Sequence, residues 1–316
     1  MKKWLFSIPA AAMAGGYLAF RHACKRMEDP DWDSEEALKK TMYAEFAESI
    51  PMARQWLRDH NARDVSITSF DGLTLRGSWV PAEKPMATII LFHGYHTHHI
   101  HDFAGIYGLY HSIGLNLLLV RQRAHGDSEG SYITFGVKER RDALSWIEFH
   151  NRTYGMDNLF LGGMSMGAST LLFAAGEDLP ANVRGITADC GFSSPAEIIS
   201  HIIRTDFHLP ARLVLPLMDI WARILGGFSF YDCHTGDTLA RSKTPILFIH
   251  GKADTFVPCH MSESGFEACH SDKEILLVDG AEHGRSYLVE PERLEKALMD
   301  FFRRNLSDEF HLEEHT

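Results

Sequence analysis

The sequence has few cysteines, no excess of basic residues and no repeated or low-complexity segment. Its five cysteines are scattered over 316 residues and lack CxxC spacing, which argues against a disulfide framework or a thiolate zinc site. The sequence does not exclude a single disulfide bond. The formal net charge is -11 and no basic stripe is present, so we expect no nucleic-acid partner. The remaining composition is ordinary for a globular domain, with 45% hydrophobic and 23% charged residues.

One apolar run stands out, at the N-terminus. It extends from Trp4 to Phe20, about 17 residues, which is at the lower limit for crossing a bilayer, and basic residues flank both ends. No small-residue cleavage site follows it. We expect residues 1–28 to form an uncleaved anchor that associates with a membrane through residues 4–20; without such an anchor, we expect the protein to be cytoplasmic. The alternative is a short apolar helix that packs on the domain.

The next segments differ in their periodicity. Residues 29–62 place apolar side chains at spacings near three and four, which predicts a helical N-terminal extension. Val65–Phe70 alternates, Asp71-Gly72 is a turn pair, and Leu73–Val80 returns, which predicts a β-hairpin.

After Pro85, short apolar runs alternate with longer helical stretches. The runs lack polar alternation, as do strands that are buried on both faces of a sheet. The pattern predicts an α/β fold, with a mostly parallel sheet and helices on both faces. The expected strands are Ala87–Phe92, Leu115–Val120, Asn158–Gly162, Gly185–Ala188, Ile246–Ile249 and Ile275–Val278.

The interval between the fourth and fifth of these strands is too long for one crossover helix. It contains the apolar, helical-looking segment Pro195–Leu225. We therefore expect a core formed by residues 63–192 and 245–306, a helical lid insertion at 193–244 above the carboxyl ends of the strands, and a tail at 307–316.

Two pentapeptides match G-x-S-x-G, a motif whose serine is a nucleophile when a strand precedes it and a helix follows. Around Ser165, Asn158–Gly162 supplies the strand and the segment that begins at Ala168 reads as a helix. Ser128 fails this test because the next helical pattern begins only near Val137. We expect Ser165 to be the nucleophile.

A serine nucleophile needs a histidine base and a carboxylate that orients the histidine, and both follow the serine in this arrangement. His283 comes after the last expected strand, and Asp254 lies in the loop after Ile246–Ile249. Both should reach the carboxyl edge of the sheet. Asp189 and Asp279 are alternative acids.

A tetrahedral intermediate also needs hydrogen-bond donors aimed at its oxyanion. The backbone N–H of Met166, directly after the serine, is one expected donor. The loop His93-Gly94-Tyr95 follows the strand Ala87–Phe92, so the N–H of Tyr95 is the other, and its side chain is expected to donate or to line the pocket.

Two further patterns are given less weight. The histidine-rich stretch from His93 to Asp102 resembles a metal-binding tract, but it coincides with the loop expected to supply an oxyanion donor, so we expect no metal. The run Arg121–Ser128 is expected to be a structural loop, with an anionic substrate on Arg123 as the alternative.

Taken together, these motifs make the chain resemble the α/β-hydrolase superfamily, and within it the serine aminopeptidase-like branch of bacterial membrane-anchored hydrolases. The resemblance spans about Asp64 to Phe302 and implies a sheet of about eight strands, a helical lid, no cofactor and an acyl-enzyme mechanism. The motifs that carry it are His93-Gly94, Arg123-x-His125-Gly-x-Ser128, Gly-Met-Ser165-Met-Gly, Ala188-Asp-Cys190, His250-Gly-x-x-Asp254-x-x-Val-Pro258 and Glu282-His283-Gly.

We therefore expect a serine hydrolase that acts on a small ester, an amide or a short peptide, with small acyl esters favoured and pocket walls supplied by the lid and Tyr95. An aminopeptidase-like peptide hydrolase is the main alternative, and it needs a carboxylate for the substrate amine, for which Glu197 and Asp206 in the lid are candidates. An acyltransferase and a non-catalytic binding module of the same fold remain further alternatives.

Overall fold

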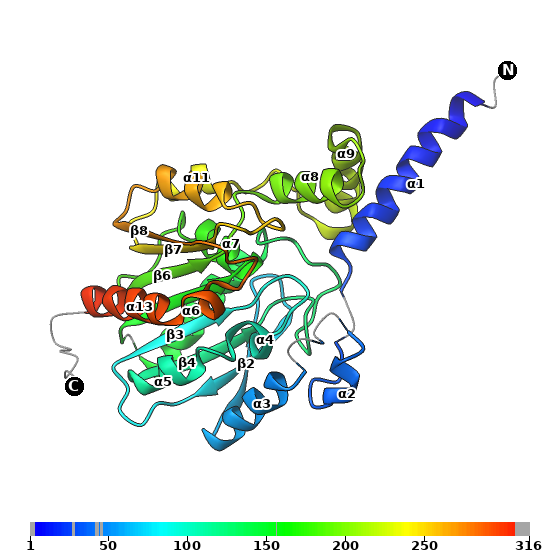
Figure 1. Ribbon diagram of the computed structural model, residues 1–316. Helices are drawn as coiled ribbons and strands as arrows, with labels where there is room; N and C mark the ends of the chain where they lie inside the picture. Colours follow the sequence, from blue (N-terminus) through cyan, green and yellow to red (C-terminus); the bar gives the residue numbers. More distant parts are fainter. Residues whose placement is uncertain (1–3, 27–28, 42–43, 45–46, 156, 307–316) are drawn as a thin grey trace.

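The computed structural model describes residues 4–26, 29–41, 44, 47–155 and 157–306, so the expected tail at 307–316 lies outside the described residues. Eight strands form one sheet in the order β1-β2-β4-β3-β5-β6-β7-β8 (Figure 1). The β1–β2 and β2–β4 pairs are antiparallel and the others are parallel. The strands are β1 (Arg63–Thr68), β2 (Thr74–Val80), β3 (Ala87–Phe92), β4 (Leu115–Arg121), β5 (Leu159–Met164), β6 (Val183–Asp189), β7 (Ile246–Gly251) and β8 (Lys273–Val278).

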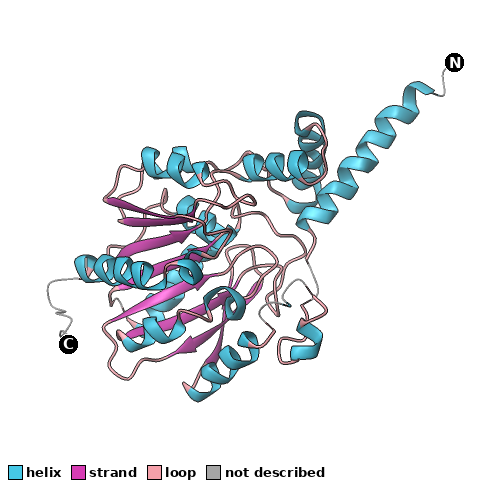
Figure 2. Ribbon diagram, viewed as in Figure 1, coloured by secondary structure: helices cyan, strands magenta, loops and turns pink. Residues whose placement is uncertain are grey.

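Helices cover both faces of this sheet, as the sequence predicts (Figure 2). Alternate residues of one strand face opposite sides, so Ile89 of β3 joins a core with Phe301 and Ile90 joins the opposite core with Trp146. The first face is covered by α3 (Ser49–Asp59), α4 (His99–Phe103), α5 (Tyr107–Ser112) and α13 (Pro291–Asn305), and the second by α6 (Glu139–Tyr154), α7 (Met166–Ala174) and α10 (Thr235–Leu239). Three further helices are α2 (Glu35–Leu38), α11 (His260–Ala268) and α12 (Ser286–Val289).

The N-terminal extension is helical only in part. The structure has two separate helices, α2 and α3, rather than the continuous segment that residues 29–62 suggest. Pro51 lies in the first turn of α3, where its missing N–H has no helical partner to lose, whereas a continuous helix would place it in the interior. Leu38 and Ile50 nevertheless enter the same core, so the segment packs on the domain as its periodicity indicates.

The first helix, α1 (Trp4–Cys24), begins in the expected anchor and ends inside the domain. Its N-terminal part projects away from the body of the molecule (Figure 1). Its C-terminal part packs against α9 (Ala211–Trp221), where Gly16 lies so close to Leu217 that a Cβ atom would approach that side chain to 2.6 Å. Phe20 and Cys24 have no exposed surface. No helix within the described part of the chain has the length and hydropathy needed to cross a membrane.

The expected lid is helical. It contains α8 (Pro195–Thr205), α9 and the short turn Ala222–Gly226, and these form a third core together with the end of α1. The lid meets the carboxyl edge of the sheet where His201 Nε2 lies 2.9 Å from the carbonyl oxygen of Thr255, in the loop after β7.

Candidate active site

Ser165 occupies a strained turn between β5 and α7. Its backbone has φ 53° and ψ -114°, outside the regions that serine ordinarily adopts. The two glycines of the motif make this turn possible, because a Cβ atom on Gly167 would lie 1.9 Å from the carbonyl oxygen of Phe92 and one on Gly163 would lie 2.5 Å from Gly167. The strand–turn–helix context expected for Ser165 is therefore present.

His283 and Asp254 form a hydrogen-bonded chain with this serine. His283 Nε2 lies 3.0 Å from Ser165 Oγ, and its Nδ1 lies 2.6 Å from Asp254 Oδ2. Asp254 is fixed from its other oxygen, which accepts hydrogen bonds from the N–H groups of Phe256 and Val257 at 2.9 and 2.8 Å. The three residues come from the loops after β5, β7 and β8, so the parallel sheet brings them together at one edge.

A second histidine supports Asp254, a contact that sequence reasoning did not identify. The fully buried His250 places its Nε2 3.2 Å from Asp254 Oδ2 and 2.8 Å from the carbonyl oxygen of Val257. Burial alone would raise the pKa of Asp254, but hydrogen bonds from His250 and His283 outweigh it and lower that pKa to about 2. The carboxylate is thus ionised at neutral pH. The only sign of this contact in the sequence is the position of His250, four residues before Asp254.

The two backbone N–H groups that we expect to be oxyanion donors can be located in the structure. Met166 is the first residue of α7, so its N–H has no partner within the helix. The N–H of Tyr95 makes no hydrogen bond to another described residue. The Tyr95 hydroxyl, by contrast, donates to the carbonyl oxygen of Ala23 at 2.8 Å, so the expected donation by this side chain into the site is not seen. Its ring does line the cavity.

A cavity of about 970 Å³ opens beside Ser165 and His283. Its walls come from α3, the segment from Gly94 to Tyr110, and α12 and α13, with Trp56, Phe103 and Leu294 among the apolar lining residues. None of the described residues that line it belongs to 193–244. The expectation that the lid supplies the pocket walls is therefore wrong, because α3 and α4 occupy that position and the lid packs against α1 instead.

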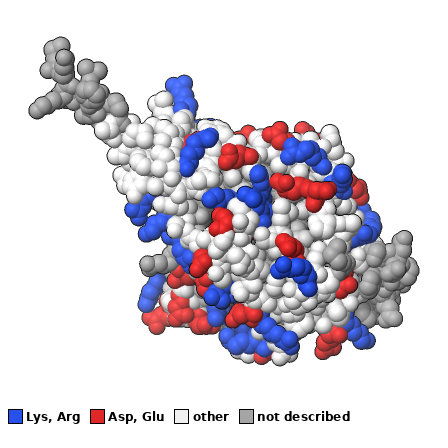
Figure 3. All heavy atoms as spheres, turned by 180° about the vertical axis from the view of Figure 1, so that it is seen from behind, with Lys and Arg blue, Asp and Glu red and all other residues white. Residues whose placement is uncertain are grey.

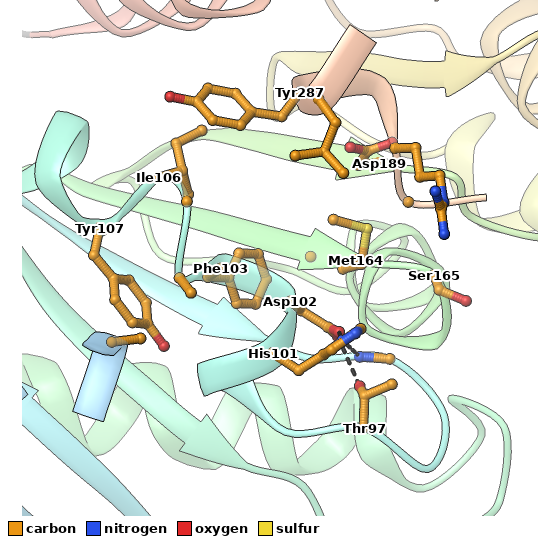
Figure 4. Close-up of a pocket in the computed structure, with 18 of the residues that line it drawn as sticks. Thr97, His101, Asp102, Phe103, Ile106, Tyr107, Met164, Ser165, Asp189 and Tyr287 are labelled. Carbon is orange, nitrogen blue, oxygen red and sulfur yellow. Dashed lines mark hydrogen bonds and ion pairs between the residues drawn. The ribbon is translucent and has the colours of Figure 1, made fainter. Parts of the chain in front are cut away.

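Asp102 is hydrogen-bonded to the loop that contains Tyr95, a role that the sequence did not indicate, since there it is only the end of the histidine-rich stretch. Its Oδ2 accepts hydrogen bonds from the N–H of Gly94 at 2.6 Å and from Thr97 Oγ1 at 2.7 Å, while Oδ1 lies 2.7 Å from His101 Nδ1 (Figure 4). Burial raises its pKa, but His101 and the N–H of Gly94 outweigh this and lower it. An ionised carboxylate thus anchors the loop from which Tyr95 projects.

The histidine-rich stretch contains side chains that make local structural contacts. His98 Nδ1 accepts from the N–H of Ile100 at the start of α4, and His99 Nδ1 lies 2.8 Å from the Tyr107 hydroxyl. Burial lowers the pKa values of His93, His98 and His99, so they remain neutral. The one grouping of possible metal ligands among the described residues is Cys190, Asp254 and His283. Two of these are already paired with each other, and burial raises the pKa of the Cys190 thiol. The absence of a metal or cofactor remains a prediction.

Other candidates lie outside the site. Ser128 is buried and donates to the carbonyl oxygen of Arg121 at 2.6 Å. Arg123 is 2% exposed and pairs with Asp71 and Asp142, so it is not available to an anionic substrate. Asp279 lies on the surface, paired with Lys252 at 2.8 Å.

The two lid acids expected as candidates for a substrate amine also lie outside the site. Glu197 contacts Ser193 and His234, and Asp206 contacts Thr205. Neither acid lines the cavity.

Comparisons with known proteins give distant relatives. No model of a known protein family matches the chain. The uncharacterized protein YqkD of Bacillus subtilis is 27% identical over 243 residues, which cover 77% of this chain and 79% of that protein. An uncharacterized membrane protein of Saccharomyces cerevisiae is 28% identical over 173 residues, which cover 52% of this chain and 53% of that protein.

Solved structures identify the fold. An esterase of Pyrococcus furiosus superposes with a TM-score of 0.66 at 23% identity, covering 79% of this chain and 94% of that one. The acylaminoacyl peptidase of Pyrococcus horikoshii gives 0.56 at 20% identity, covering 79% of this chain and 43% of that one. With its eight-stranded, mostly parallel sheet, the chain has the α/β-hydrolase fold, as the sequence predicts.

Proposed function

We propose that the protein is a serine hydrolase that cleaves carboxylic esters or amides through an acyl-enzyme intermediate. The observation that carries this proposal is the hydrogen-bonded chain from Ser165 Oγ through His283 to Asp254, at a strained turn beside an apolar cavity. The esterase and peptidase neighbours are consistent with it.

The geometry suggests the division of roles. Ser165 Oγ attacks the acyl carbon while His283 Nε2 takes its proton, and Asp254 stabilises the imidazolium that forms. The negative oxygen of the tetrahedral intermediate is received by the N–H groups of Tyr95 and Met166. His283 then gives the proton to the leaving alcohol or amine. Water repeats the sequence on the acyl-enzyme and releases the acid.

The alternatives differ either in the acceptor that resolves the acyl-enzyme or in the substrate that forms it. An acyltransferase would resolve it with an acceptor other than water, and an aminopeptidase-like enzyme would bind a free amine near the scissile bond. Small acyl esters fit the site, but a cavity of about 970 Å³ also has room for a considerably larger acyl group. We also propose that the protein belongs to the serine aminopeptidase-like branch of this superfamily.

Labelling by a fluorophosphonate probe tests the hydrolase proposal, because the probe reacts with activated serines. We expect the full chain to be labelled and Ser165→Ala to lose the label. Ser264→Ala, on the exposed surface of α11, is the matched control and should label like the wild type. Ser128→Ala checks the second motif. A folded wild-type protein that takes no label, or equal labelling of Ser165→Ala, would contradict the proposal.

We also propose that α1 and the lid rest on a membrane surface. Exposed apolar side chains gather where these elements meet, and Figure 3 shows that the surface around the emerging helix is largely uncharged, with basic side chains beside it. Apolar groups with adjacent basic residues suit an anionic lipid surface. The apolar residues are Leu18, Phe207, Leu209, Leu213, Ile220, Ile224 and Leu225, and the exposed basic ones are Arg21, Arg204, Arg212 and Arg223.

A further inference from the structure

One carboxyl group in the cavity wall has an oxygen without a partner. Asp189 is the last residue of β6, is 9% exposed, and lines the same cavity as Ser165 (Figure 4). Its Oδ1 is buried and makes no hydrogen bond to any described residue. Buried polar groups in native proteins are nearly always hydrogen-bonded, and leaving one unpaired is costly. The arrangement therefore calls for a partner from elsewhere.

The other buried acids near the site are fully engaged. Asp102 accepts hydrogen bonds from Gly94 and Thr97 and contacts His101, and Asp254 accepts from two backbone N–H groups as well as two histidines. Asp189 differs from both, although it lies in the same wall. Neither carboxyl oxygen of Asp189 makes a hydrogen bond to a described residue, and Oδ1 has almost no exposed surface, so a partner from the cavity is expected to reach this carboxyl through Oδ2.

The position of Asp189 ties it to the nucleophile. Met164, the residue before Ser165, is its register partner between β5 and β6, and the Ser165 N–H donates to the Asp189 carbonyl oxygen at 2.8 Å. An acyl group attached to Ser165 and lying in the cavity therefore shares this space with the Asp189 side chain.

The surroundings favour a cation over a neutral group. The ionisable groups that act on Asp189 are the carboxyls of Asp254 and Asp102, which repel a negative charge, and the imidazoles of His250 and His283, which favour it. Tyr110, Tyr287, Cys190 and Arg285 are further titratable or charged residues near it, and Arg285 Nε lies 3.8 Å from Glu282. The aromatic rings of Phe103, Tyr107 and Tyr287 line the cavity, and such rings attract cations.

We propose that Asp189 binds a primary ammonium group carried by the acyl part of the substrate, so that the preferred substrates are esters or amides of amino-substituted acids. This specificity rests on the proposed hydrolase function. It gives to Asp189 the role that sequence reasoning offered to Glu197 and Asp206, which lie outside the cavity. Burial raises the pKa of Asp189 to about 7, so an incoming ammonium also draws the carboxyl into its charged form.

Matched ester pairs test this proposal. The ethyl esters of 2-aminobutanoic, 4-aminobutanoic and 6-aminohexanoic acid are each compared with the ester that lacks the amine, by measuring the ethanol released. Because hydrogen bonds to charged groups contribute about 1.5–3 kcal/mol, we expect kcat/KM to favour at least one amino ester by roughly tenfold or more. In Asp189→Asn this preference should fall to near one, mainly through KM, with the plain esters still hydrolysed.

Controls separate the outcomes. Asp279→Asn removes a surface carboxylate and should keep the wild-type preference. In the wild type the preference should grow as pH rises from 5 to 7, a readout that does not depend on any variant folding. Hydrolysis of the plain esters with no amino preference, or with a preference that Asp189→Asn retains, would overturn the role of Asp189 alone. No hydrolysis of any ester by folded wild-type protein would instead contradict the proposed function, and this inference with it.

Discussion

At the scale of single residues, the proposed chemistry of the site depends on how Asp254 holds His283. The carboxylate contacts Nδ1 at 2.6 Å, which keeps the proton on that nitrogen and leaves Nε2 free to accept from Ser165. In Asp254→Asn we expect kcat on an activated ester to fall by about 10³- to 10⁴-fold with little change in KM. Steady-state kinetics on the full chain measure this, and a fall of less than tenfold would assign the orienting role elsewhere.

Asp189 gives a stability prediction with a definite sign. Burial, reinforced by the charges of Asp254 and Asp102, raises its pKa to about 7, above the value near 3.9 that an unfolded chain has. The folded state therefore holds this proton more tightly, and its contribution to the free energy of unfolding is lost as pH rises from about 4 to about 7.

Asp189→Asn should consequently stabilise the fold above pH 7, by up to about 4 kcal/mol, and change stability little at pH 4. Urea denaturation at both pH values measures the difference. Equal effects at the two pH values would mean that the pKa of the Asp189 carboxyl is not higher in the folded state than in the unfolded state.

The residues whose grouping the sequence could predict are those whose position follows from chain order. Ser165, Asp254 and His283 each follow a recognisable strand, and parallel strands bring their following loops to one edge. Asp102 and His250 act through contacts with loops and side chains that no local pattern reveals. Asp189 was visible as an acid at a strand end, but its missing partner is a property of packing alone.

At the scale of elements, the packing of α1 bears on the two alternatives that its sequence left open. Its N-terminal part projects from the domain, while Phe20 and Cys24 are buried and the Ala23 carbonyl oxygen accepts from Tyr95. Removal of residues 2–12 should leave the stability of the domain nearly unchanged. Removal of residues 2–28 should cost at least about 3 kcal/mol, because it deletes a fully buried phenylalanine among other contacts.

Urea denaturation of the two truncated proteins and the full chain distinguishes these cases. An unchanged free energy of unfolding after the longer deletion would show that the helix is an independent anchor. A large loss after the shorter deletion would mean that the projecting part is also needed by the fold.

The sequence located the strands well because their apolar runs are buried on both sides. The sequence was less informative about the lid, because the apolar character of Pro195–Leu225 predicts that this segment is buried but not which element it packs against. In the structure that partner is α1, through close packing at Gly16 and a hydrogen bond from Trp221 Nε1 to the Met13 carbonyl oxygen at 2.9 Å. Part of the cavity wall is α3, whose amphipathic pattern predicts a helix but not the cavity that this helix lines.

At the scale of the whole molecule, the exposed apolar side chains near α1 predict binding to lipid. Leu213 and Ile224 are 61% and 64% exposed. Replacing both with aspartate should weaken binding to vesicles with anionic lipid by at least about tenfold, since burial of each side chain contributes roughly 1.5–3 kcal/mol. Vesicle sedimentation measures this. Val289→Asp, an exposed apolar position on α12, serves as the control, and equal binding by all three proteins would argue against this surface.

The central claim is that Ser165 is an activated nucleophile within a hydrolase cavity. The most direct test is mass spectrometry of the full chain after reaction with a fluorophosphonate, followed by digestion to locate the adduct. We predict one adduct per chain, on Ser165. An adduct on another serine, or none on a folded protein, would contradict the account.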